Sequence, residues 1–165
     1  MLVAFQVRSL LERPKVNDQV RSICMPVLRY KKIGNRPFTF VGPGMLHDRF
    51  DLQSPERESM SSLDVCNQLI HYYWMQTCSD GCEFTSMLVF SDYKRCKCAY
   101  EFQIKDLLQL FQAFCGDSSA VVSAEFRWNE KKQDYVCTRA LGEGGLQTAS
   151  VSAANKITAP NEGGR

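Results

Sequence analysis

The sequence lacks the long apolar runs from which a membrane-spanning helix is built. None of its 165 residues falls in a stretch of about 18 consecutive apolar residues. The sequence also has only two histidines, no Gly-x-Ser-x-Gly motif and no glycine-rich phosphate loop that ends in lysine. We therefore expect no membrane partner and no familiar hydrolase or nucleotide-binding chemistry, and a small enzyme with an unrecognised site stays an alternative.

Length and composition are those of one globular domain, with 44% apolar and 23% charged residues. The net charge of +2 is unevenly distributed along the chain. Residues 1–50 carry nine Lys or Arg against three Asp or Glu, whereas residues 51–115 carry five against nine. Such a basic front is typical of a segment that contacts a polyanion.

The first residues predict the compartment. Residues 1–5 are apolar, but Gln6 and Arg8 follow at once, and this pattern is too short for a secretory leader. We therefore expect an intracellular protein, cytoplasmic or nuclear, whose thiols stay reduced.

Cysteine is the residue type that stands out, because five of the eight copies fall within residues 66–98. Cys78 with Cys82, and Cys96 with Cys98, have spacings that a zinc site could use. The eight positions are Cys24, Cys66, Cys78, Cys82, Cys96, Cys98, Cys115 and Cys137.

A hairpin formed by residues 83–90 and 96–102 would separate these two pairs. In a regular register Cys98 lies opposite Leu88, and Cys82 lies opposite Ile104. Six strand positions separate Cys98 from Ile104, so Cys82 and Cys98 are roughly 20 Å apart at about 3.3 Å per residue. One zinc ion holds its sulfur ligands at about 2.3 Å, so it cannot bridge that distance.

Two interpretations of the cysteines stay open. No cofactor is required, but zinc remains a candidate through a partial site at Cys96, Cys98, Cys115 and Cys137. Alternatively the thiols are packing groups, since Cys66 and Cys115 both fall on apolar faces of predicted helices.

A cluster of basic residues is the candidate nucleic-acid surface. Arg29, Lys31, Lys32 and Arg36 alternate with aromatic residues in the basic front of the chain. Cations can bind phosphates while rings stack on bases, so this pattern is typical of a nucleic-acid-binding face. Lysines also protect the solvent-facing edge of a sheet, and this is the competing interpretation.

The histidines carry less information. His71 lies near Asp64 on the polar face of a predicted helix, where an Asp–His pair could orient a base. His47 lies beside Asp48 in a polar stretch. Without a nucleophile in a recognisable context, both are interpreted as solvated side chains.

The front part of the chain predicts short strands. Val3, Phe5 and Val7 alternate at period two, which favours a strand. Residues 23–33 predict an edge strand, or one that bends at Pro26, and residues 37–41 a short return strand. We therefore expect a basic, β-rich segment over residues 1–44 and a loop or linker over residues 45–62.

The rest predicts a helix–hairpin–helix–hairpin core over residues 63–141. A helix runs from Leu63 to about Gln76 with Ser61 or Ser62 as its cap, and a second helix covers residues 104–115. Hairpins of residues 83–90 with 96–102, and of 120–128 with 134–139, follow these helices. The fold class is α+β, an antiparallel sheet built from hairpins with two amphipathic helices packed on one face. Residues 142–165 have little to bury and predict a disordered tail.

One stretch of about twenty-five residues resembles a known family. Met87-Leu-Val-Phe90, Cys98-Ala-Tyr-Glu-Phe102 and the segment from Leu107 to Phe111 are similar to part of the small first-reading-frame proteins of sobemoviruses. The resemblance implies a viral protein that suppresses RNA silencing and aids spread, with zinc bound by cysteines in some members. It also implies host factors or RNA as partners.

These patterns together favour a non-enzymatic regulatory protein that acts by binding a macromolecule, either a protein or RNA. The specific form implied by the resemblance is a suppressor of host RNA silencing or defence. A nucleic-acid-binding protein that uses its basic front is the first alternative, and a small enzyme is the second.

Overall fold

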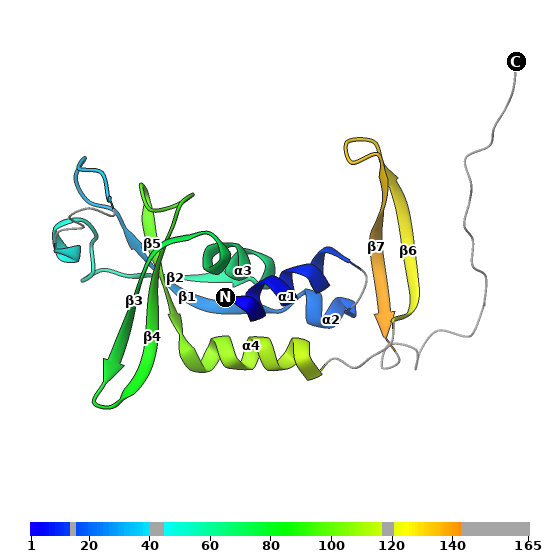
Figure 1. The fold of residues 1–165 in the computed structure, drawn as a ribbon, viewed down its shortest axis with the longest axis horizontal. Helices are drawn as coiled ribbons and strands as arrows, with labels where there is room; N and C mark the ends of the chain where they lie inside the picture. The colour runs from blue at the N-terminus through cyan, green and yellow to red at the C-terminus, as the bar shows by residue number, and fades with distance from the viewer. Residues whose placement is uncertain (14–15, 40–44, 117–120, 143–165) are drawn as a thin grey trace, which may run out of the picture.

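The structure is a computed structural model, and it describes residues 1–13, 16–39, 45–116 and 121–142. Within these ranges the strands form two separate sheets, drawn in Figure 1. The larger is a five-stranded antiparallel sheet in the order β2-β1-β5-β4-β3, and the smaller is the hairpin β6–β7. The strands are β1 Cys24–Lys31, β2 Glu56–Ser61, β3 Tyr72–Asp80, β4 Glu83–Ser91, β5 Cys98–Gln103, β6 Val121–Asn129 and β7 Asp134–Gly142.

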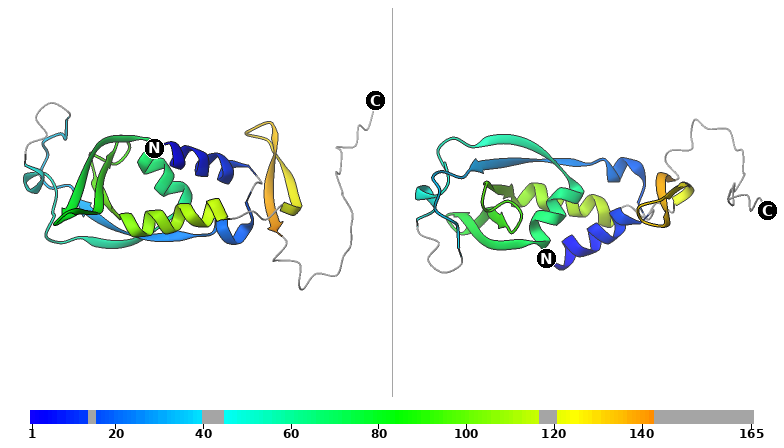
Figure 2. Two further views of the ribbon diagram at one scale, coloured as in Figure 1. Left: turned by 60° about the horizontal axis from the view of Figure 1, so that its bottom comes forward. Right: turned by 90° about the horizontal axis from the view of Figure 1, so that it is seen from above.

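Helices lie against one face of the larger sheet, so the α+β class predicted from the sequence is confirmed. The helical elements are α1 Leu2–Glu12, α2 Asp18–Arg21, η1 Leu46–Asp48, α3 Ser62–Ile70 and α4 Ile104–Gly116. α1 contacts both α3 and α4, and Figure 2 shows these three helices side by side. No helix in the described ranges is long and apolar enough to cross a membrane.

The strand predicted around residues 3–7 is wrong, because this segment is helix α1. Ala4, Val7 and Leu11 are buried at helical spacing, while Val3 and Phe5 are exposed. The apparent period of two rested on three residues, of which only Val7 is buried, whereas Ala4, Val7 and Leu11 follow a helical period.

The helix predicted from Leu63 to about Gln76 is too long. α3 ends at Ile70, and the following aromatic and β-prone residues form β3, which pairs antiparallel with β4. Pairing with a strand already in the sheet satisfies the backbone of residues 72–80 and overrides the helical periodicity.

The loop predicted over residues 45–62 is also corrected, because this segment contains η1 and the edge strand β2. β2 pairs with β1, which therefore has neighbours on both sides and is not an edge strand overall. Pro26 nevertheless lies where only β2 flanks β1, since pairing with β5 begins at Leu28. The missing proline N–H is tolerated at such a position.

The strand predicted at residues 37–41 is absent from the described part, residues 37–39, and residues 40 and 41 lie outside the described ranges. Phe38 is instead fully buried as a packing residue. The tail predicted to be disordered begins at Gly142, which ends β7, and the rest of it lies outside the described residues.

The hairpins predicted downstream are confirmed as β4–β5 and β6–β7, with one correction to register. Leu88 pairs with Glu101, whereas the regular hairpin places Leu88 opposite Cys98. The turn after Ser91 runs to Lys97, so β5 begins at Cys98 instead of Cys96, and the register differs from the regular one by three residues. β6–β7 does not join the larger sheet.

Side chains alternate between two core layers on the two faces of the larger sheet. Val89, Cys98 and Phe102 face the helices and pack with residues such as Val7, Val65 and Leu107. The opposite face carries the second core layer, Tyr30, Phe38, Phe50, Leu88, Phe90 and Ala99.

The predicted cap of α3 is confirmed at Ser61, whose Oγ accepts a hydrogen bond from Asp64 N at 3.1 Å. Replacing Ser61 with alanine is expected to lower the free energy of unfolding by about 1 kcal/mol, because one helix N–H loses its partner. Urea denaturation of Ser61→Ala measures the change. Ser59→Ala, which alters an exposed residue of the same strand, is the control and should cost a few tenths at most. Equal stability of the two variants would contradict the capping role.

Candidate binding surface

The predicted basic face is partly neutralised by the neighbouring strand. Arg29 Nη1 lies 3.2 Å from Glu56 and 3.1 Å from Glu58, and Lys31 forms an ion pair with Glu56. The hydrogen bond from Lys31 holds the pKa of the Glu56 carboxyl below its ordinary value. β2 thus sets its carboxylates against the cations of β1, and Arg29 and Lys31 do not form an open basic surface.

The other two predicted residues lie beyond the end of β1. Lys32 Nζ donates to the carbonyl oxygen of Gly34 at 2.7 Å. Arg36 is exposed and lines a small cavity together with Arg49. The structure therefore divides the four residues into a paired half on the sheet and a second half in the following loop.

The cysteines predicted as a partial zinc site are spread over the fold. Cys98 is buried under the helices, Cys96 and Cys115 are exposed, and Cys137 is half-buried on β7. In the described ranges, no three His, Cys, Asp or Glu residues are grouped so that they could hold a metal ion. Zinc binding by these residues stays a prediction without a site that the structure assembles.

Of the two cysteines predicted to be core residues, only one is. Cys66 is fully buried, and burial raises the pKa of its thiol to about 11, so it is a packing group. Cys115 is exposed, because α4 directs Leu107, Leu110 and Phe114 inward.

The histidines do not form a catalytic pair. His71 Nε2 lies 3.4 Å from Arg8 Nη1, and its ring packs edge-on against Tyr93 at 5.0 Å. Asp64 accepts a hydrogen bond from Ser61 Oγ instead, at 2.7 Å. His47 is exposed beside Asp48 at 3.3 Å.

The carboxylate of Glu101, on the second-layer face of the larger sheet, is hydrogen-bonded to two side chains. Glu101 accepts hydrogen bonds from Tyr30 Oη and Ser86 Oγ, which ties β1, β5 and β4 together. Burial, with the Glu101 carboxylate beside it, raises the pKa of Tyr30, so its hydroxyl keeps its proton and remains a donor. This arrangement stabilises the sheet by satisfying a half-buried acid.

The β6–β7 hairpin carries a group of exposed aromatic side chains. Trp128 and Tyr135 are cross-strand partners whose rings meet edge-on at 5.3 Å, and Phe126 lies two residues before Trp128 on the same side of its strand. The exposed fractions are 50% for Phe126, 47% for Trp128 and 43% for Tyr135. Exposed rings that are grouped together, unlike scattered ones, are typical of an interaction surface.

Cations accompany these rings. The side chains of Arg127, Lys131 and Lys132 are exposed and form no hydrogen bond or ion pair with any residue that the structure describes. Arg139, further along the hairpin, is 3.9 Å from Glu125. Arg127 lies on the other side of the strand from Phe126 and Trp128, because neighbouring strand residues point to opposite sides. We define the aromatic–basic surface as Phe126, Trp128 and Tyr135 with the turn lysines Lys131 and Lys132.

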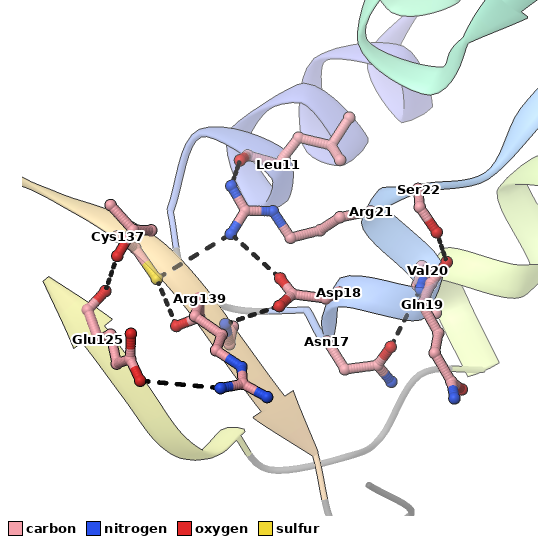
Figure 3. A network of polar contacts seen from close by, with 12 residues as sticks. Leu11, Asn17, Asp18, Gln19, Val20, Arg21, Ser22, Glu125, Cys137 and Arg139 are labelled. Atoms are coloured by element: carbon pink, nitrogen blue, oxygen red, sulfur yellow. Dashed lines mark hydrogen bonds and ion pairs between the residues drawn. The ribbon is translucent and has the colours of Figure 1, made fainter.

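A polar network fastens the other end of the hairpin to the helical part, as Figure 3 shows. Asp18 accepts a hydrogen bond from Ala140 N at 3.2 Å, and Ala140 is fully buried. Arg21 donates to Leu11 O at 3.4 Å and to Cys137 Sγ at 4.0 Å. These contacts position the hairpin and leave its aromatic side chains exposed.

The sequence predicted strands β6 and β7 but not the aromatic–basic surface that they carry. The available signal was the alternation of large rings with polar residues on both strands, next to two lysines in the turn. The prediction placed this hairpin in one sheet with the other hairpin and both helices on one face, so it gave no reason to expect a separate hairpin with exposed rings.

No protein family, curated protein or solved structure matched this chain in the three comparisons. Its function is therefore argued from the surfaces described above.

Proposed function

We propose that this protein acts by binding rather than by catalysis, and that it binds single-stranded RNA through the aromatic–basic surface of the β6–β7 hairpin. One observation carries the proposal: three half-exposed rings stand next to a turn whose two lysines have no side-chain partner in the described part of the chain. The hairpin is also set apart from the larger sheet, so both of its sides reach solvent over much of their length (Figure 1).

The chemistry of single-stranded RNA suits this combination. Unpaired bases expose their flat faces and stack on aromatic side chains whatever their sequence. The ammonium groups of the turn lysines would contact the phosphates. A role in suppressing RNA silencing, which the resemblance to sobemoviral proteins implies, would be one biological use of such a surface.

A protein partner is the second candidate for the same surface. Tryptophan and tyrosine are among the residue types that dominate protein–protein contacts, and both occur here. Glu130 and Asp134 also lie at the turn, where their charge would oppose phosphate binding. The two candidates differ in salt dependence, because only RNA releases condensed counterions from its backbone.

The cations of the turn are expected to contribute to RNA affinity and to its salt dependence. Replacing Lys131 and Lys132 with serine should weaken binding of a fluorescent oligouridine. The slope of log affinity against log salt should fall by about 1.4, since each phosphate contact contributes about 0.7. Fluorescence anisotropy at a series of salt concentrations measures both quantities.

A matched control separates this surface from the basic front predicted from the sequence. Replacing both Lys31 and Lys32 with serine removes the same charge from β1 and its end. The slope of log affinity against log salt should then stay at the wild-type value. A lower slope in this control would place the RNA at the N-terminal basic residues instead. Absence of RNA binding by the wild-type protein even at low salt would contradict the proposal.

A further inference from the structure

A second basic feature lies at the far end of the molecule from the hairpin. The loop that follows β1 and the segment around η1 enclose a cavity of about 390 Å³ lined by Ile33, Gly34, Asn35, Arg36, Asp48 and Arg49. These segments and the β6–β7 hairpin occupy opposite ends of the molecule in Figures 1 and 2. The cavity is therefore separate from the proposed RNA surface.

Backbone hydrogen bonds fix the two walls of this cavity relative to each other. Ile33 N donates to Arg49 O at 2.7 Å, and Asp51 N donates to Lys31 O at 2.9 Å. An isolated β-bridge joins Lys32 and Phe50 between them. The fully buried ring of Phe50 anchors one wall in the second core layer, so the walls do not depend on a ligand for their position.

The charged groups of the cavity favour an anion. Arg49 Nη1 donates to Pro37 O at 2.9 Å, which orients its guanidinium and leaves its other N–H groups available. Arg36 forms no side-chain hydrogen bond or ion pair with the described residues. The single carboxylate of the lining, Asp48, is 3.3 Å from His47 Nε2.

We propose that this cavity, the Arg36–Arg49 pocket, binds a phosphate group carried by a ligand. Guanidinium groups match phosphate oxygens with paired hydrogen bonds, and two of them beside one cavity can hold a dianion. The volume lies within the range of small-molecule sites, so it accommodates a nucleotide-sized phosphate ester as well as one unit of an RNA backbone. Ile33 supplies an apolar wall for the rest of the ligand.

The test compares uridine 5′-monophosphate with uridine as probes of the full chain, using isothermal titration calorimetry. The monophosphate should bind and uridine should not. Arg36→Gln and Arg49→Gln together should weaken monophosphate binding by about tenfold or more, because two charge-assisted contacts are lost. Arg36→Gln alone, at a side chain without hydrogen bonds or ion pairs to the described residues, should weaken monophosphate binding without affecting the fold.

Arg57→Gln is the matched control, because it removes one exposed arginine from β2 outside the cavity. It should bind the monophosphate like the wild type. Equal binding of uridine and its monophosphate, or an unchanged affinity in the Arg36 and Arg49 variants, would overturn the proposal.

Oligouridine binding by the same variants distinguishes an RNA backbone phosphate from a small phosphate ester as the ligand of the pocket. If the double arginine variant also loses affinity for oligouridine, the pocket takes an RNA backbone phosphate. If oligouridine affinity is unchanged while monophosphate binding is lost, the ligand is a small phosphate ester. The monophosphate assay does not depend on the hairpin, so the pocket can fail or succeed independently of RNA binding by β6–β7.

Discussion

A variant with alanine at both Phe126 and Trp128 is expected to lose most of its affinity for single-stranded RNA. Each stacked base contributes about 1–3 kcal/mol, so two lost rings should weaken binding by about thirtyfold or more. Anisotropy of a labelled oligouridine measures the effect without relying on tryptophan fluorescence. The backbone pairing of β6 with β7 does not involve these side chains, so the hairpin should persist.

Two controls show whether a loss of RNA affinity comes from the missing rings or from unfolding. Phe5→Ala and Phe84→Ala remove exposed rings from α1 and from the tip of β4, and both should bind RNA like the wild type. The Phe126/Trp128 variant should also unfold at nearly the wild-type urea concentration, since exposed rings contribute little to stability. Wild-type RNA affinity in that variant would exclude the rings as the stacking surface.

The elements that could be predicted from the sequence are those specified by local signals. β4, β5 and the β6–β7 pair combine β-prone residues with turn residues, and α4 carries a long apolar face that ends at Gly116. In each case the neighbour in sequence is also the neighbour in space, so no distant partner has to be known.

The elements that were not predicted are decided by pairing with another strand and not by their own residue pattern. β2 is polar along most of its length and becomes a strand because β1 offers a free edge. β3 has apolar residues that also fit a helix, and only its pairing with β4 decides between the two. The extended turn after Ser91 shifts the β4–β5 register by three residues, and no local sequence pattern predicted this shift.

The surroundings of the predicted basic residues were missed for a similar reason. Arg29 and Lys31 form a basic run in the sequence, but Glu56 and Glu58 approach them from a strand that the sequence analysis assigned to a loop. Charge along the chain is therefore a poor guide to charge on the surface when the opposing strand is unknown. Arg36 and Arg49 show the converse, because residues thirteen apart in sequence line one cavity.

Phe38 is expected to be the most costly single residue to truncate. It is fully buried in the second core layer, with its ring stacked on Phe90 at 4.6 Å and edge-on to Phe50 at 5.5 Å. Arg95 donates to its carbonyl oxygen at 2.6 Å, which holds the loop in place. Phe38→Ala should lower the free energy of unfolding by about 3–5 kcal/mol through lost burial and the cavity left behind.

Urea denaturation of Phe38→Ala beside Phe84→Ala tests this expectation with the same chemical change at a buried and an exposed ring. Phe84 is 66% exposed, so its truncation should cost less than about 0.5 kcal/mol. Phe38→Leu, which keeps most of the volume, should recover much of the loss. A cost for Phe38→Ala as small as that for Phe84→Ala would mean that the loop after β1 does not seal the second face of the sheet. That loop also forms one wall of the Arg36–Arg49 pocket, so a large cost would tie the shape of the pocket to the core beneath it.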